Sequence, residues 1–157
     1  MIRKPVVRLF SLAASLWLPP VLIAQSAGES QHHAHAFAHV VIGPQITAPV
    51  SGRLLIFARK AEAAAADKNS GSEDGKKKVD ISEFHPTDTS VAAQEIHDLA
   101  PGSAVEIDLD RVAFPAAFSN MPRGDYELQA VLDLDHNYNY GGRDAEDWES
   151  PVFEARG

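Results

Sequence analysis

Residues 122–135 read PRGDYELQAVLDLD, and their alternation decides the fold class. Apolar side chains occupy every second position, at Tyr126, Leu128, Ala130 and Leu132. Successive side chains of a β-strand point to opposite faces, so this period of two predicts a strand with one apolar face. The Pro-x-Gly turn before it predicts a tyrosine corner, in which the Tyr126 hydroxyl bonds to nearby backbone.

A second stretch, SGRLLIFARK at residues 51–60, is apolar on both faces between Arg53 and Arg59. A strand that buries both of its faces lies inside a sheet that is covered by two layers. We therefore expect this segment to be the central strand of the fold.

Shorter strands, separated by turns rich in proline and glycine, make up the rest of the domain. AVEIDLD at residues 104–110 alternates cleanly, and KVDISEF at residues 78–84 places Val79 and Ile81 on one face. Residues 90–99 fit either a strand or a helix. Together with strand-like runs near both ends of the domain, about seven short strands predict an all-β fold, an antiparallel immunoglobulin-like β-sandwich.

The N-terminal residues 1–26 predict a signal peptide. A positive stretch precedes an apolar run, residues 9–24, that is too short for a comfortable bilayer span, and Ala24-Gln25-Ser26 fits a cleavage site. The alternative is an uncleaved N-terminal anchor. We therefore expect export to the periplasm or the cell exterior, with no stable membrane insertion after cleavage.

The exported part is expected to form a single domain. Residues 27–38 predict a flexible His-rich leader, and residues 39–157 predict the sandwich itself. Within it, residues 61–78 predict a mobile charged loop because they contain no large apolar side chain. The alanines at the start of this loop can form one helical turn.

Charge and cysteine content exclude several classes of function. The formal net charge is −8, and it becomes −11 without the predicted signal peptide, because 11 Lys and Arg then face 22 Asp and Glu. Nucleic acid is not an expected partner, since phosphate binding needs clustered Lys and Arg. Without cysteine there is no disulfide, thiolate metal site or cysteine nucleophile. Stability must come from packing, for which we expect these core residues: Leu55, Phe57, Ile107, Tyr126 and Leu128.

The acidic stretch LDLDHNYNYGGRDAEDWES, residues 132–150, is the first candidate site. Oxygen-bearing side chains at alternate positions can converge on a hard cation as the loop bends, which predicts a Ca²⁺ site. The spacing matches part of an EF-hand loop, but Tyr140 stands where that loop needs glycine. A solvated hairpin or a partner contact is the alternative. The expected Ca²⁺ ligands are Asp133, Asp135, Asn137, Asn139 and Glu146.

Histidines next to the predicted signal peptide are the second candidate site. Neutral imidazole binds Cu²⁺, Ni²⁺ or Zn²⁺, and His32, His33 and His35 are the expected Cu²⁺ ligands. The alternative is a flexible leader that binds metal only adventitiously. Near the acidic stretch, Trp148, Tyr138 and Tyr140 offer either a platform that binds a sugar or a partner, or a cap on the end of the sandwich.

Three segments in order carry a resemblance to a known family: residues 51–60, residues 98–135, and YGGRDAEDWESPV at residues 140–152. They resemble the N-terminal β-sandwich domain of a group of exported bacterial esterases, in which a separate α/β-hydrolase domain follows. The resemblance covers residues 45–153 and implies an accessory domain that positions substrate or covers the active-site entrance, with a hydrolase domain or subunit as partner. Its most specific parts are Gly52 to Phe57, Phe114-Pro115, and Pro122 to Ala130.

Catalysis does not follow from this resemblance. An α/β-hydrolase needs a Gly-x-Ser-x-Gly nucleophile elbow, an acid and a histidine, and no such pentapeptide occurs in the chain. The chain also ends at Gly157, where the hydrolase of the related architecture would begin. We therefore expect a non-catalytic exported binding domain without a cofactor. The alternative is a periplasmic metal-binding protein that uses the acidic loop for Ca²⁺ or the N-terminal histidines for Cu²⁺.

Overall fold

The structure is a computed structural model that describes residues 35–66, 77–139 and 143–157. The predicted signal peptide, His32 and His33, and most of the predicted mobile loop lie outside these ranges. Within them, no helix is both long enough and apolar enough to cross a bilayer.

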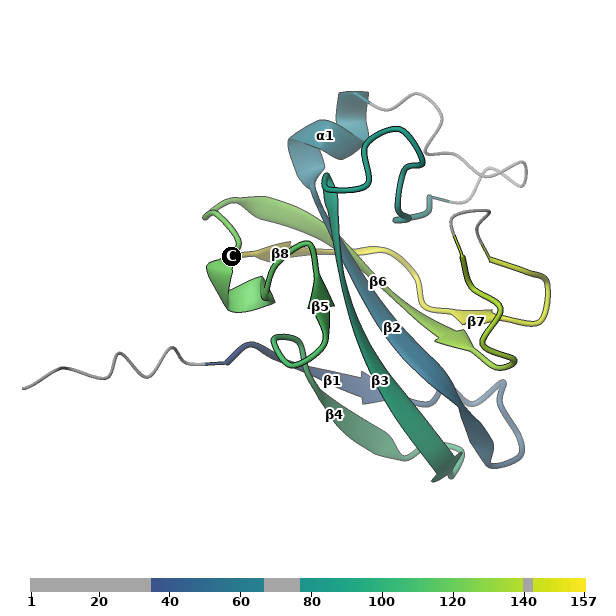
Figure 1. Ribbon diagram of the computed structural model, residues 1–157. Coiled ribbons are helices and arrows are strands. Elements are labelled where there is room, and N and C mark those ends of the chain that lie inside the picture. The colour runs from purple at the N-terminus through teal and green to yellow at the C-terminus, as the bar shows by residue number, and fades with distance from the viewer. Residues whose placement is uncertain (1–34, 67–76, 140–142) are drawn as a thin grey trace, which may run out of the picture. The chain divides into compact units, whose positions relative to one another are not determined.

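The described residues form an antiparallel all-β structure with eight strands, which confirms the predicted fold class (Figure 1). The strands are β1 (Phe37–Val41), β2 (Val50–Lys60), β3 (Thr89–Leu99), β4 (Ala104–Asp108), β5 (Ala113–Phe114), β6 (Asp125–Asp133), β7 (Trp148–Glu149) and β8 (Phe153–Arg156). A short helix α1 (Ala61–Ala66) and a 3₁₀ turn η1 (Phe118–Asn120) complete the elements. The alanine run after β2 thus forms the expected helical turn.

Two sheets of unequal size make up the sandwich. The larger sheet has the order β5-β3-β2-β6-β7, with β8 also paired to β6, and the smaller one consists of β1 and β4. β2 lies between β3 and β6 over most of its length, which confirms the predicted central strand. Six strands against two differ from the four and three of an immunoglobulin constant domain, so the immunoglobulin-like subtype stays a prediction.

Both faces of β2 are buried, in two separate apolar clusters. Leu54 and Ile56 join side chains of the smaller sheet, such as Ile107, in the cluster between the sheets. Leu55 and Phe57 point to the opposite face and pack in a second cluster that includes Val79 and Val131. The five predicted core residues are therefore divided between the clusters, with Leu55 and Phe57 in the second and Ile107, Tyr126 and Leu128 in the first.

Two stretches differ from the sequence prediction. Residues 78–84 form no strand, although Val79 and Ile81 do pack on the same side, in the second cluster. The reason is that the Val79 N–H donates to the side-chain oxygen of Gln129 at 2.9 Å, which replaces a strand partner. In addition, β1 begins at Phe37, so the end of the expected leader belongs to the smaller sheet, where the Leu109 N–H donates to Ala36 O at 2.9 Å.

The turn before β6 forms the predicted tyrosine corner. The Tyr126 hydroxyl donates to the carbonyl oxygen of Pro122 at 2.6 Å, and the ring is buried between the sheets. Burial raises the pKa of this hydroxyl, so it stays protonated and able to donate. The bond fixes the path of the chain into β6.

Replacing Tyr126 with phenylalanine tests this corner. We expect Tyr126→Phe to lower the free energy of unfolding by about 1 kcal/mol, because the ring stays packed and one hydrogen bond is lost. Urea denaturation measures the change. The control is Phe84→Ala, whose side chain is 86% exposed and whose removal should change stability by less than about 0.5 kcal/mol. Equal effects of the two substitutions would contradict the role of the hydroxyl.

Candidate functional site

Asp133, at the end of β6, organises the acidic stretch that follows it. Its side chain is 0% exposed and pairs with Arg53 of β2, with 2.5 Å between Arg53 Nη2 and Asp133 Oδ2. The carboxylate also accepts the backbone N–H groups of Asn137 at 3.1 Å and Tyr138 at 3.3 Å. A buried carboxylate needs such partners, and they bend the loop back toward β6.

Three carboxylates meet at this bend. Asp133, Asp135 and Asp147 each place one oxygen so that the three atoms lie within 4.8 Å of one another. Two of these are predicted Ca²⁺ ligands, but the third is Asp147, not the predicted Glu146. The backbone N–H of Glu146 instead donates to the side chain of Asp144 at 2.8 Å, and Glu146 itself is exposed.

The two predicted asparagines stabilise the loop. The Asn137 side-chain amide donates to Asp135 Oδ2 at 2.8 Å and to the carboxylate of Asp144. The Asn139 side-chain amide donates to the carbonyl oxygen of Asn137 at 3.0 Å. These bonds hold the acidic side chains in place, and the hydrogen bond from Asn137 keeps the pKa of Asp144 below its ordinary value.

The environment of Asp147 disfavours its charge, although its Oδ2 accepts the backbone N–H of Asp144 at 3.2 Å. Burial, followed by the charges of Asp144, Asp133 and Asp135, raises its pKa. Among the described residues, its buried Oδ1 has no hydrogen-bond partner. A cation between the three carboxylates would offset both penalties.

Arg143 holds the acidic stretch against the larger sheet, a role that no pattern in the sequence predicts. Its side chain is 1% exposed, and the guanidinium lies 5.1 Å from the centre of the Phe57 ring. It donates to Gln129 Oε1 at 2.9 Å and to the carbonyl oxygen of Val79, and it pairs with Glu149 at 3.3 Å. An arginine in a charged loop ordinarily stays in water, so only the fold reveals this one.

Tyr138 packs against the larger sheet. Its ring packs against Phe57 with 5.4 Å between ring centres, and its hydroxyl donates to Asp80. Burial is the main cause that raises the pKa of this hydroxyl. Tyr138 thus covers the face of the larger sheet that carries Phe57, and neither of the two roles left open for the aromatic residues is confirmed by this contact.

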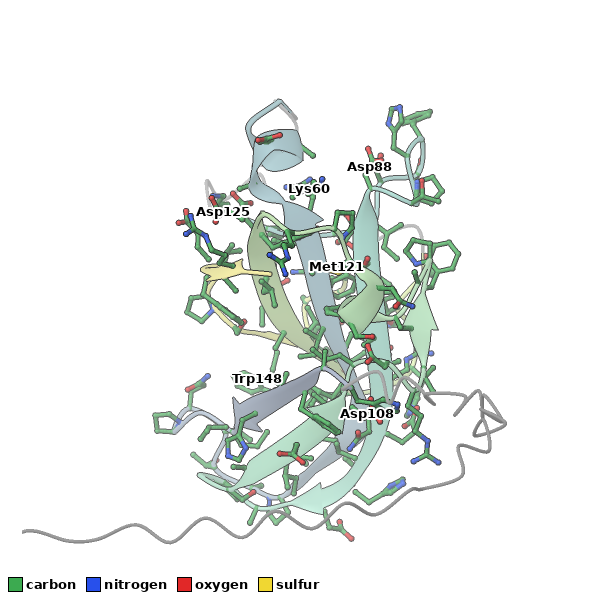
Figure 2. The ribbon with its side chains drawn as sticks, turned by 90° about the vertical axis from the view of Figure 1, so that its left-hand side faces the viewer. Lys60, Asp88, Asp108, Met121, Asp125 and Trp148 are labelled. Carbon is green, nitrogen blue, oxygen red and sulfur yellow. The ribbon has the colours of Figure 1, made fainter. Side chains whose placement is uncertain are left out.

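Trp148, which is labelled in Figure 2, has a different environment and lines an apolar groove. Its side chain is 37% exposed. The groove runs between the end of β1, the turn after it, and the paired part of β6 and β7, and it has a volume of about 190 Å³. Pockets for small molecules usually have about 300 Å³ or more, so this groove is smaller than a typical small-molecule pocket. Its walls include Val41, Ile42, Ile46, Leu132, Trp148 and Pro151.

His35 is the one predicted Cu²⁺ ligand within the described residues. Its Nδ1 lies 2.9 Å from Asp108 Oδ2 at the end of β4. This hydrogen bond raises the pKa of His35 and lowers that of Asp108. Asp110 lies close to both side chains.

Comparisons with known proteins identify no relative. No family model matches the chain, and no curated protein or solved structure matches it either. The structure therefore defines the class, an antiparallel all-β protein, and the resemblance to esterase-associated domains stays a prediction.

Removing Arg143 tests how firmly the acidic stretch is held. We expect Arg143→Ala to lower the free energy of unfolding by about 3 kcal/mol, because it removes one of the two donors to Gln129 Oε1, leaves the Val79 carbonyl without the Arg143 donor and exposes Phe57. Chemical denaturation measures the loss. Arg123→Ala is the matched control, since Arg123 is exposed, and it should change stability by less than about 0.5 kcal/mol. A loss no larger than that of the control would show that the buried contacts contribute nothing.

Proposed function

We propose that this protein is a non-catalytic, exported β-sandwich domain that binds beside an esterase of the α/β-hydrolase class. The best support is the position in the fold of the segments that resemble esterase-associated domains. Gly52 to Phe57 lies in the central strand β2, and Tyr126 to Ala130 lies in its neighbour β6. Their side chains form much of the two apolar clusters, and Gln129 donates to the Ser150 carbonyl. Residues that resemble the family thus stabilise the fold, as expected of a structural domain.

The groove beside Trp148 is the surface at which we expect the hydrolase to contact this domain. Its apolar walls and small volume suit side chains of a protein partner. β1 forms one wall, and within the described ranges it pairs with β4 alone, so its other edge offers unpaired backbone groups. An apolar loop or edge strand of the hydrolase can use both features at once.

Testing this function starts with a search for a hydrolase gene beside the gene of this chain and with purification of its product. We expect the two purified proteins to form a complex, and Trp148→Ala to weaken it by about tenfold or more, because a half-exposed tryptophan is a typical centre of binding energy. Isothermal titration calorimetry measures the affinity. Phe84→Ala removes an exposed aromatic that does not line the groove, and it should bind like the wild type. The absence of a neighbouring hydrolase, or of a complex with it, would refute the proposal.

Ca²⁺ binding at the acidic stretch is a second candidate function, supported by the cluster of Asp133, Asp135 and Asp147. Arg53 compensates only the first of these charges, and in the described part of the chain neither Asp135 nor Asp147 pairs with a Lys or Arg. Ca²⁺ takes six to eight oxygen ligands, to which backbone carbonyls and water contribute the remainder. The excess negative charge and the oxygen donors suit this ion.

Two substitutions distinguish a Ca²⁺ site from an acidic loop that is solvated and binds no ion. In the wild type, we expect a Ca²⁺ concentration about 100 times Kd to stabilise the fold by about 2.7 kcal/mol. Asp135→Asn should abolish this gain. Asp147→Asn should abolish it too, without lowering stability in the absence of Ca²⁺, because it removes a charge that burial disfavours. Thermal denaturation with and without Ca²⁺ measures both, with the exposed Asp88→Asn as control. A wild type whose melting temperature ignores Ca²⁺ would disprove the site.

A further inference from the structure

We propose that His35, Asp108 and Asp110 form a binding site for a divalent transition-metal ion of the zinc class. The site lies where the chain enters β1 and leaves β4 (Figure 2). It goes beyond the proposed function, since it needs neither a hydrolase nor the acidic stretch after β6. None of its carboxylates is among the ligands that the sequence predicts.

Pairing of the two strands of the smaller sheet brings these residues together. Phe37 lies opposite Asp108 in the register of β1 and β4. Just beyond this pair, the Leu109 N–H donates to the carbonyl oxygen of Ala36 at 2.9 Å. The segment before β1 therefore runs alongside the segment after β4, and His35 comes to lie next to both aspartates.

The spacing of the donor atoms suits a metal ion. One atom each from His35, Asp108 and Asp110 lies within 4.8 Å of the other two, and His35 Nδ1 is 2.9 Å from Asp108 Oδ2. Zinc ligands stand about 2.1 Å from the ion, so two neighbouring ligands are about 3.0–3.4 Å apart. A metal ion can thus replace the proton shared by His35 and Asp108 with little movement of either side chain.

Backbone hydrogen bonds hold the carboxylates in position. Asp110 accepts the N–H groups of Ala36 at 3.0 Å and Ser119 at 2.9 Å, and Asp108 accepts the N–H of Asp110 at 3.0 Å. Each carboxylate oxygen has two lone pairs, so these bonds leave room for a metal. Ligands that are oriented in this way lose little conformational freedom when the ion binds.

Charge also favours a cation at this place. In the part of the chain that the structure describes, no Lys or Arg side chain pairs with Asp108 or Asp110, and His35 is the partner of Asp108. The His35 side chain is 55% exposed, so an ion and its waters can reach the site. The two aspartates therefore carry negative charge that no Lys or Arg balances in the described residues, and an ion in water can reach them.

The mixed donor set selects the class of metal. Imidazole nitrogen combined with carboxylate oxygen suits zinc and its neighbours, whereas Ca²⁺ and Mg²⁺ prefer oxygen alone. Three protein ligands leave a coordination position for water. The cluster after β6 has oxygen donors alone and therefore suits Ca²⁺ better than Zn²⁺. The two clusters thus favour different classes of metal ion.

Titration of the purified protein with zinc chloride tests the site. We expect one Zn²⁺ per chain and a rise in melting temperature. His35→Ala and Asp108→Asn should each weaken Zn²⁺ binding by tenfold or more, while their melting temperatures without metal show that they fold. His97→Ala removes an exposed histidine of β3 and should keep the wild-type affinity. Failure of the wild type to bind Zn²⁺, or wild-type affinity in His35→Ala and Asp108→Asn, overturns the proposal.

Two further variants exclude other sources of the signal. The double variant His32→Ala/His33→Ala should keep binding, because the three proposed ligands remain. Asp135→Asn should keep it as well, because it alters only the acidic stretch after β6. Loss of Zn²⁺ binding in either variant, with retention in Asp108→Asn, would place the metal elsewhere and overturn the proposal. Success or failure here is independent of Ca²⁺ binding and of any complex with a hydrolase.

Discussion

The burial of both faces of β2 is the constraint on which the rest of the structure depends. A strand with no face toward water needs cover on two sides, and this chain supplies two different kinds. The smaller sheet covers Leu54 and Ile56. Leu55 and Phe57 are covered by irregular segments, which contribute Val79, Ile81, Tyr138 and Val152. Because irregular segments cannot satisfy their backbone groups by pairing as strands, side chains must do so. Gln129 therefore accepts the Val79 N–H, and Arg143 donates to the Val79 carbonyl.

The irregular segment after β6, which covers Phe57, also carries candidate functional residues. The loop that brings Arg143 and Tyr138 over Phe57 is the same loop that gathers Asp133, Asp135 and Asp147. Its return to the sheet at β7 leaves Trp148 at the rim of the groove. Packing of the core and presentation of the sites are thus coupled, because the contacts that hold this loop on the sheet also fix the positions of its carboxylates.

The smaller sheet plays a comparable part on the other side of the molecule. Two strands make a small sheet, and its pairing extends beyond the strands into the hydrogen bonds of Ala36 with Leu109 and Asp110. Those bonds bring an imidazole to two carboxylates, whereas the bend after β6 gathers carboxylates alone. The difference in donor atoms follows from which segments each pairing joins, and it distinguishes the proposed zinc-class site from the proposed Ca²⁺ site.

Local pattern in the sequence determined the all-β class, the central strand and the tyrosine corner, because alternation and turn residues act within a few positions. Only the tertiary structure decided which distant side chains meet. It placed Asp147 rather than Glu146 with Asp133 and Asp135, buried Arg143, and brought His35 to Asp108 across 73 positions of the chain. It also made residues 78–84 an irregular segment, although their alternation predicts a strand. Such outcomes depend on strand register and loop conformation, which are set by long-range packing and leave no signal in a local window of sequence.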